Sequence, residues 1–142
     1  MPGEKNLQRM LATLEPVLLD TEYVFCSLEN ASFGDQPELA PIAAFMESEG
    51  LTLVIPREEA ERHQITFTAT FRCITLQLHS SLEAVGLTAA VSSALAKHGI
   101  SANIIAAFFH DHVFVPTARA GEALAVLIGL SDINADDQKN RR

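Results

Sequence analysis

The sequence lacks the features that would direct the protein to a membrane, out of the cell or onto nucleic acid. No apolar run approaches the roughly 20 residues that a membrane-spanning helix needs, and residues 1–6 lack the apolar core of a signal peptide. Lys and Arg number only 10 against 18 Asp and Glu, for a formal net charge of -8. The cations are scattered, which disfavours nucleic acid and anionic membrane surfaces as partners. These absences predict a cytoplasmic protein.

Cysteine and catalytic motifs are also scarce. The two cysteines, Cys26 and Cys73, each lie in an apolar, strand-like run, so we expect reduced thiols in the core. There is no CxxC, no Cys/His metal spacing, no Gly-x-Ser-x-Gly elbow, no phosphate loop, no dinucleotide fingerprint and no HExxH. The sequence therefore predicts neither a cofactor nor a catalytic constellation.

The first part of the chain alternates between helical and strand-like apolar spacing. Pro56 is suited to the first position of a helix, with acidic residues following it. The expected elements before it are a helix at 5–14, strands at 17–19 and 23–28 joined by a hairpin at Asp20-Thr21, a helix over 39–46 closed by Gly50, and a strand at 51–55.

The second part opens with the longest expected strand, 66–78. Its apolar residues change parity near Cys73, which predicts either a bulge or a crossing from one sheet to another. The elements expected after it are a helix over 87–95 closed by His98-Gly99, a buried central strand at 102–109, a tight turn at His110-Asp111, a strand at 112–115, a helix from Thr117 with the stripe Ala120, Leu124, Leu127 and Ile128, and a frayed polar tail.

The two parts are incomplete in complementary ways. Residues 5–55 give a split βαββαβ unit without its first strand, and residues 72–130 give the same unit without its last strand. We therefore predict an α+β protein of two ferredoxin-like halves with antiparallel sheets that share the long connecting strand. The expected boundaries are 1–64 and 65–131, followed by a disordered tail at 132–142.

Several segments resemble a known family. Residues 81–87 (SLEAVGL), 101–106 (SANIIA), 110–116 (HDHVFVP) and 50–56 (GLTLVIP) are similar to a bacterial family of uncharacterised proteins with ACT-like domains. Related domains recur in the animal cytosolic arginine sensors. The resemblance covers roughly residues 8–130. It implies a ferredoxin-like, ACT-type fold for each half and amino-acid sensing as in better-understood members.

The predicted topology brings two segments to one edge of a sheet. In a βαββαβ unit the third strand lies antiparallel beside the first, so the loop after Leu78 meets the turn before His112. That loop runs into a helix N-terminus, which favours a carboxylate, and acidic side chains nearby would accept hydrogen bonds from an ammonium group. The candidate ligand-binding residues are His79, Ser80, Ser81, Leu82, Glu83, Val85, Gly86, Leu87, Asn103 and Asp111.

Each of these residues also has a structural interpretation. The serines could cap a turn or helix, Gly86 and Asp111 could supply turn geometry, Glu83 could be a solvated carboxylate, and Asn103 could be a hydrogen-bonded core amide. A zinc site of His79, His110 and His112 is a further alternative, although a turn at Asp111 would separate the last two, and His112 fits a structural position.

We therefore predict a non-catalytic regulatory protein that binds a small molecule, an amino acid, without nucleic acid or membrane as partners. Uncovered sheet edges favour a homodimer. Two alternatives stay open: an assembly module that binds protein partners without a ligand, and a metal-dependent enzyme that uses the three histidines.

Overall fold

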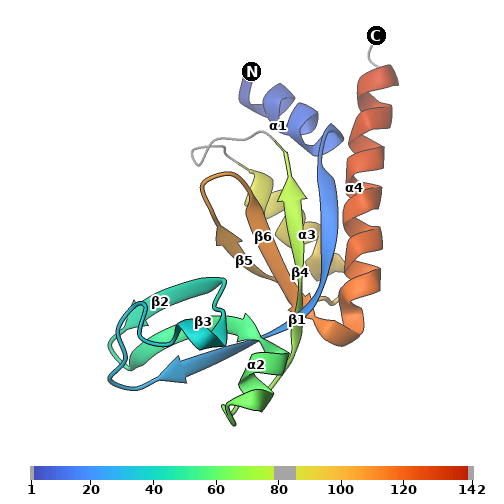
Figure 1. Cartoon of the computed structure of the whole chain (residues 1–142). Helices are drawn as coiled ribbons and strands as arrows, with labels where there is room; N and C mark the ends of the chain where they lie inside the picture. The colour runs from blue at the N-terminus through green and yellow to red at the C-terminus, as the bar shows by residue number, and fades with distance from the viewer. Residues whose placement is uncertain (1, 79–85, 141–142) are drawn as a thin grey trace. The chain divides into compact units, whose positions relative to one another are not determined.

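The computed structural model describes residues 2–78 and 86–140. The chain forms two compact units, shown in Figure 1. Unit 1 comprises Met1–Leu19 and Cys73–Arg142, and unit 2 comprises Asp20–Arg72. These units are divided at other positions than the sequence halves 1–64 and 65–131, whose boundaries stay a prediction.

Unit 1 contains a sheet with helices packed on it. Its strand order is β1-β4-β6-β5, which leaves β5 at an edge. β5 and β6 pair antiparallel, with Asn103 opposite Phe114 and Ala106 opposite Asp111. The elements are α1 (Pro2–Ala12), the start of β1 (Glu15–Leu28), β4 (Phe71–Gln77), α3 (Leu87–Lys97), β5 (Asn103–Ala106), β6 (Asp111–Pro116), the 3₁₀ turn η2 (Thr117–Arg119) and α4 (Ala120–Asn140).

The core of unit 1 lies on the side of the sheet that α1, α3 and α4 cover. Successive strand residues face opposite sides, so Ile74, Leu76 and Leu78 enter this core while Gln77 faces the other way. The helices contribute apolar side chains at helical spacing. Those that are fully buried are Val91, Leu95, Ala123 and Leu127.

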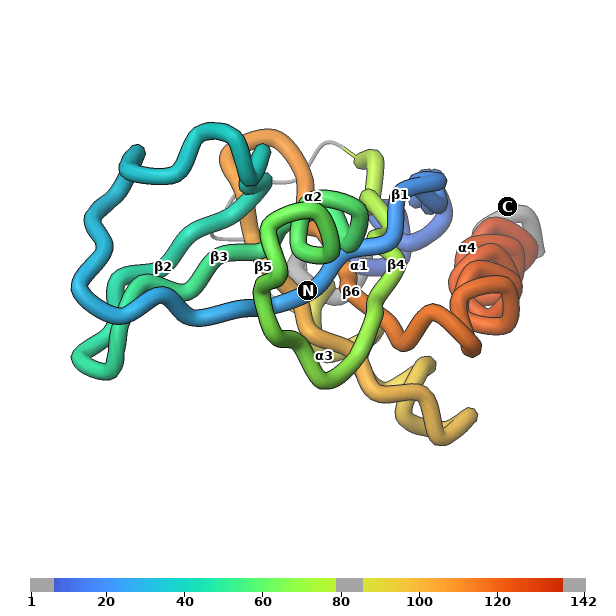
Figure 2. Tube along the Cα trace, turned by 60° about the horizontal axis from the view of Figure 1, so that its bottom comes forward, coloured from blue at the N-terminus to red at the C-terminus, as the bar shows by residue number. Residues whose placement is uncertain are grey.

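Unit 2 is a three-stranded arrangement with order β2-β3-β1. Figures 1 and 2 show β2 and β3 side by side, and they pair antiparallel through a tight turn. Besides the rest of β1, its elements are the 3₁₀ turn η1 (Pro37–Leu39), β2 (Ala43–Glu47), β3 (Gly50–Pro56) and α2 (Arg57–Arg62). Its buried core is Val24, Cys26, Leu39, Leu51, Leu53, Ile55 and Ala60.

Two expectations for the first part of the chain are wrong. The hairpin at Asp20-Thr21 does not form, because β1 is one strand from Glu15 to Leu28 that belongs to both units. The helix over 39–46 is also absent. Pro41 disfavours helical geometry in the residue before it, and Ala40 takes φ +52° after η1, so the chain continues as β2.

The strand at 66–78 is shorter than expected, and β1 is the longer strand. β4 begins at Phe71, and the boundary between the units falls between Arg72 and Cys73, where the parity of the apolar residues changes. Cys26 and Cys73 are free and buried, as predicted.

The expected buried strand at 102–109 is wrong. β5 has only four residues and lies at the sheet edge, while the side chains of Phe108 and Phe109 are 77% and 75% exposed. An apolar run alone does not distinguish a central strand from an edge strand with an apolar turn. The turn itself is closed by the Ala107 N–H, which donates to the His110 carbonyl at 3.1 Å, and Asp111 already begins β6.

The expected frayed tail is helical as far as the structure describes it. α4 continues to Asn140, and Ser131 Oγ donates to the Ala12 carbonyl at 3.3 Å. Asn134 Nδ2 also donates to the Leu130 carbonyl at 2.8 Å. Polar residues are compatible with a helix whose outer side faces solvent, so composition alone was misleading here.

Candidate functional site

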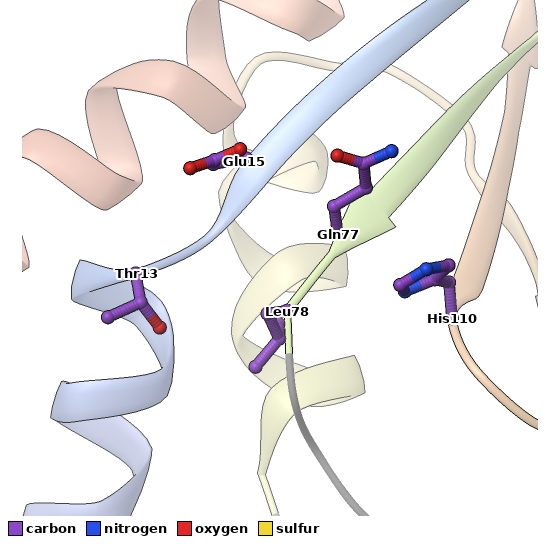
Figure 3. Close-up of a pocket in the computed structure, with 5 residues that line it drawn as sticks. All are labelled: Thr13, Glu15, Gln77, Leu78 and His110. Carbon is purple, nitrogen blue, oxygen red and sulfur yellow. The ribbon is translucent and has the colours of Figure 1, made fainter.

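A pocket of about 560 Å³ lies in unit 1 where β4 ends. Its described lining comes from three places in the chain: the α1–β1 junction, the end of β4 and the residue before β6 (Figure 3). The residues are Thr13, Glu15, Gln77, Leu78 and His110. The volume lies within the 300–1,000 Å³ that is typical of small-molecule sites.

The α1–β1 junction fixes one wall of the pocket. The Thr13 hydroxyl donates to the Arg9 carbonyl at 3.2 Å and to the Met10 carbonyl at 3.1 Å, and the Thr13 N–H donates to the same two carbonyls at the end of α1. Glu15 follows as the first residue of β1, and its side chain is exposed. The pocket therefore contains a solvent-accessible carboxylate, that of Glu15, and the end of α1 determines its position.

The opposite wall combines an amide and an imidazole. Figure 3 shows Gln77 between Glu15 and His110, with the His110 ring extending toward β4. His110 Nδ1 is buried and has no hydrogen-bond partner among the described residues. An unsatisfied buried polar group costs about 1–3 kcal/mol. A ligand atom that bonds to Nδ1 after the ring turns to expose it would recover part of that cost.

A second histidine supports the strands next to the pocket. Nδ1 of His112 lies 3.1 Å from the Thr75 hydroxyl, which links β6 to β4. Burial lowers the pKa of His112, His110 lowers it further, and Asp111 partly opposes both effects. Burial also raises the pKa of Cys73, on the same side of β4, to about 11, against a smaller opposing effect of the hydrogen bond with Thr75. His112 thus occupies the structural position expected for it.

Most of the predicted ligand loop lies outside the described residues: His79, Ser80, Ser81, Leu82, Glu83 and Val85. The last described residue before this segment, Leu78, lines the pocket. The role of the predicted loop in binding stays a prediction.

Gly86 and Leu87 have clear structural roles. Gly86 has φ +96°, and a Cβ built on it would lie 3.0 Å from Cδ2 of Leu7. Its carbonyl accepts a hydrogen bond from the Ala90 N–H at 2.9 Å in the first turn of α3. Leu87 is 4% exposed in the core. Their contribution to a ligand site stays a prediction.

The remaining two predicted residues lie at different ends of β5 and β6. Asp111 is half-buried and directly follows His110, so it lies next to the pocket. Asn103 is exposed and pairs with Phe114, three positions along β5 from the pair Ala106–Asp111. The expectation of a buried amide at Asn103 is wrong because β5 is an edge strand.

The metal alternative has no support in the part of the chain that the structure describes. There, no three His, Cys, Asp or Glu residues lie close enough together to hold a metal ion. His79 is outside those residues, and Nδ1 of His112 is engaged with Thr75.

Sequence reasoning missed Thr13, Glu15 and Gln77 and considered His110 only as a turn residue and a candidate metal ligand. Gln77 carried a usable signal, since it is polar between Leu76 and Leu78 at the end of a strand that leads into the predicted loop. Glu15 carried none, because its approach to β4 requires β1 to be the neighbouring strand, which is a non-local pairing.

Family comparison agrees with this architecture. Two profiles described as ACT domain match the chain, one at residues 2–72 and one at residues 68–128. The chain belongs to the ACT domain family. This confirms the resemblance to ACT-like domains and the prediction of two ACT-type halves.

Solved structures extend the comparison of this ACT-domain protein. A Vibrio cholerae protein of unknown function, described as a possible transport protein, is 46% identical over 91% of this chain and 98% of its own, with a TM-score of 0.83. An Agrobacterium tumefaciens protein shares 15% identity over 83% of this chain and 89% of its own, with a TM-score of 0.66.

The regulatory subunit of aspartate kinase from Thermus flavus shares 10% identity over 82% of this chain and 95% of its own, with a TM-score of 0.56. At such identities the likeness shows the fold alone. A search of curated proteins finds no match to the chain. Within the described residues, no helix combines the length and apolar character needed to cross a membrane.

Proposed function

We propose that this ACT-domain protein is a non-catalytic regulatory protein of the cytoplasm that binds an amino acid in the pocket at the end of β4. The observation that carries the proposal is that Glu15, Gln77 and His110 line one pocket of about 560 Å³. The buried Nδ1 of His110 has no hydrogen-bond partner among the described residues. A homodimer is the proposed form of the protein.

The pocket chemistry suits a ligand that carries both a cation and hydrogen-bonding groups. The Glu15 carboxylate would accept charge-assisted hydrogen bonds from an α-ammonium group, each contributing about 1.5–3 kcal/mol. Gln77 offers both a donor and an acceptor. We propose that the ligand carboxylate is held by Ser80, Ser81 and the backbone N–H groups near the start of α3, where a helix dipole favours negative charge.

The relatives support a regulatory role. The aspartate kinase structures with this fold include chains described as regulatory subunits. A regulatory chain needs a ligand site and no catalytic residues, which agrees with the absence of catalytic motifs from the sequence.

Thermal unfolding with each of the twenty amino acids tests the proposal. A ligand at 100 times its Kd should stabilise the protein by about 2.7 kcal/mol. Glu15→Gln should reduce that stabilisation by weakening the contact with the ammonium group, whereas Asn103→Ala, at the other end of β5, should retain it. Unfolding curves unchanged by all twenty amino acids would contradict amino-acid binding.

One observation favours a second function, assembly with a protein partner. The side chains of Phe45 in unit 2 and of Phe108 and Phe109 in unit 1 are mostly exposed, and all three lie on or beside edge strands. If no amino acid stabilises the protein, this function replaces the first. A stabilisation by zinc that a chelator removes would instead support the metal-dependent enzyme with His79, His110 and His112.

A further inference from the structure

A second hollow of unit 1 lies between α3 and α4, away from the proposed ligand pocket. It has a volume of about 540 Å³. One face of α4 supplies most of its lining, at the spacing of successive helical turns. The residues that line this hollow, called the α3–α4 groove below, are Ala94 and Lys97 of α3, His98 directly after it, and Glu122, Ala125, Val126, Gly129, Leu130 and Ile133 of α4.

The groove has apolar features that the fold of one chain does not use. Gly129 lies within α4, where glycine costs about 1 kcal/mol relative to alanine, yet a Cβ built on it would meet nothing within 4 Å. Ile133 is 62% exposed at one end of the groove, and Ala125 is exposed one turn before Gly129. The groove thus has a hollow at Gly129 and a projecting apolar side chain at Ile133.

The two ends of the groove carry opposite charges. At one end, Lys97 is exposed, and Arg119 pairs with Glu122 at 2.9 Å while donating to the His98 carbonyl at 2.8 Å. Two cations face one carboxylate there. At the other end α4 presents the exposed carboxylates of Asp132 and Asp136.

Two copies of this groove are complementary to each other when their α4 helices run in opposite directions. If two α4 helices cross antiparallel at Gly129, Ile133 of each copy lies opposite Ala125 of the other, on the same apolar stripe. The same rotation brings Asp136 of each copy opposite Glu122, whose charge Arg119 offsets, at the end of the groove that Lys97 also lines. Small residues at a crossing point allow close helix packing, and opposite charges at the ends set the orientation.

We propose that the α3–α4 groove is the docking surface for a second copy of this chain, whose α4 helix crosses it antiparallel at Gly129. Because the surface is a single groove between two helices, we expect a weak association, with a Kd on the order of 10–100 µM. This inference is independent of the amino-acid site.

Sedimentation equilibrium of the full chain over that concentration range tests the groove. The unmodified protein should dimerise, and Gly129→Leu should raise the dimer Kd more than about tenfold because its side chain fills the hollow. Gly121→Leu is the matched control: it lies on the same helix, a Cβ there also meets nothing within 4 Å, and it does not line the groove. Helical circular dichroism should be retained in both variants.

Charge reversal tests the orientation. Lys97→Glu and Asp136→Lys should each raise the dimer Kd about tenfold at low salt, and the double variant should return it to within about threefold of the unmodified value. A protein that stays monomeric, a Gly129→Leu variant that dimerises like the Gly121→Leu control, or a double variant as weak as the single ones would each overturn the proposal.

Discussion

The two units differ in the size of their buried cores and in the pockets that they contain. In its described residues, unit 1 combines three helices and four strands, and its core draws on all three helices and on strands β4 and β6. Unit 2 has three strands and a short helix, and its core cluster consists of seven buried residues. Both hollows described above lie in unit 1. A larger core holds side chains in place around a pocket, which agrees with the proposal that the ligand binds to unit 1.

Unit 2 carries ion pairs on its surface in addition to its small apolar core. On α2, Arg57 lies 2.8 Å from Glu22 of β1, and Arg62 lies 3.1 Å from Glu58. Exposed ion pairs of this kind contribute little to stability. Small cores bury a smaller share of their surface than large ones, so unit 2 should be the part of the chain that opens more readily.

The largest expected effects come from substitutions that create a cavity of the same kind in each of the two cores. Ile74 of unit 1 and Ile55 of unit 2 are both fully buried. Ile74→Ala should cost about 4 kcal/mol and Ile55→Ala about 2 kcal/mol, because a small core collapses more easily around a cavity. Urea unfolding measures both. A larger cost for Ile55→Ala would reverse the ranking of the cores.

A pair of glycine substitutions sharpens the comparison at tight turns. Gly50 of unit 2 has φ +153°, and a Cβ there would lie 2.9 Å from the Leu28 carbonyl oxygen. Gly86 of unit 1 would meet only the flexible end of Leu7. Gly50→Ala should therefore cost about 2–4 kcal/mol and Gly86→Ala about 1–2 kcal/mol. If urea unfolding gives equal losses of stability for the two variants, the close contact of the Cβ with backbone does not explain the cost at Gly50.

A smaller effect concerns pH and is specific to unit 1. The pKa of His112 is lower in the folded protein than its ordinary value near 6.5, chiefly because of burial. The unfolded chain then binds more protons, so stability should be complete above pH 6.5 and fall as pH decreases from there toward the lowered pKa. Urea midpoints between pH 5 and 8 measure this.

His112→Asn should flatten that pH dependence, while His63→Gln in unit 2 should retain it. A slope unchanged in His112→Asn would assign the pH dependence to other groups.

The smallest difference concerns the two buried thiols. Burial raises the pKa of both Cys26 and Cys73, the latter to about 11, so both should react slowly with a thiol reagent. Cys26 should react faster because it becomes accessible when unit 2 opens. Labelling of the Cys26→Ala and Cys73→Ala variants separates the two rates, and faster labelling of Cys73 would argue against an easily opened unit 2.

The sequence predicted the parts of the fold that depend on local patterns. α3 was expected over 87–95 and spans Leu87–Lys97, because its apolar spacing is regular and His98-Gly99 ends it. The strand expected at 112–115 is β6. The region that became β2 was misread because apolar residues at 39, 42, 43 and 46 imitate helical spacing, and Pro41 was given too little weight.

The site was only partly predictable for a related reason. The sheet edge at the end of β4 was foreseen, and His110 and Asp111 lie there. Glu15 and Thr13 were not, since only the pairing of β1 beside β4 brings them in. Nothing within residues 13–15 indicates which strand will be their neighbour.

An NMR titration with the amino acid that most raises the unfolding temperature tests the assignment of ligand binding to unit 1 most directly. The account predicts saturable shifts of the amide signals of Gln77, Leu78, His110 and Asp111, with those of β2 and β3 in unit 2 unchanged. Shifts confined to unit 2, or none with any of the twenty amino acids, would contradict it.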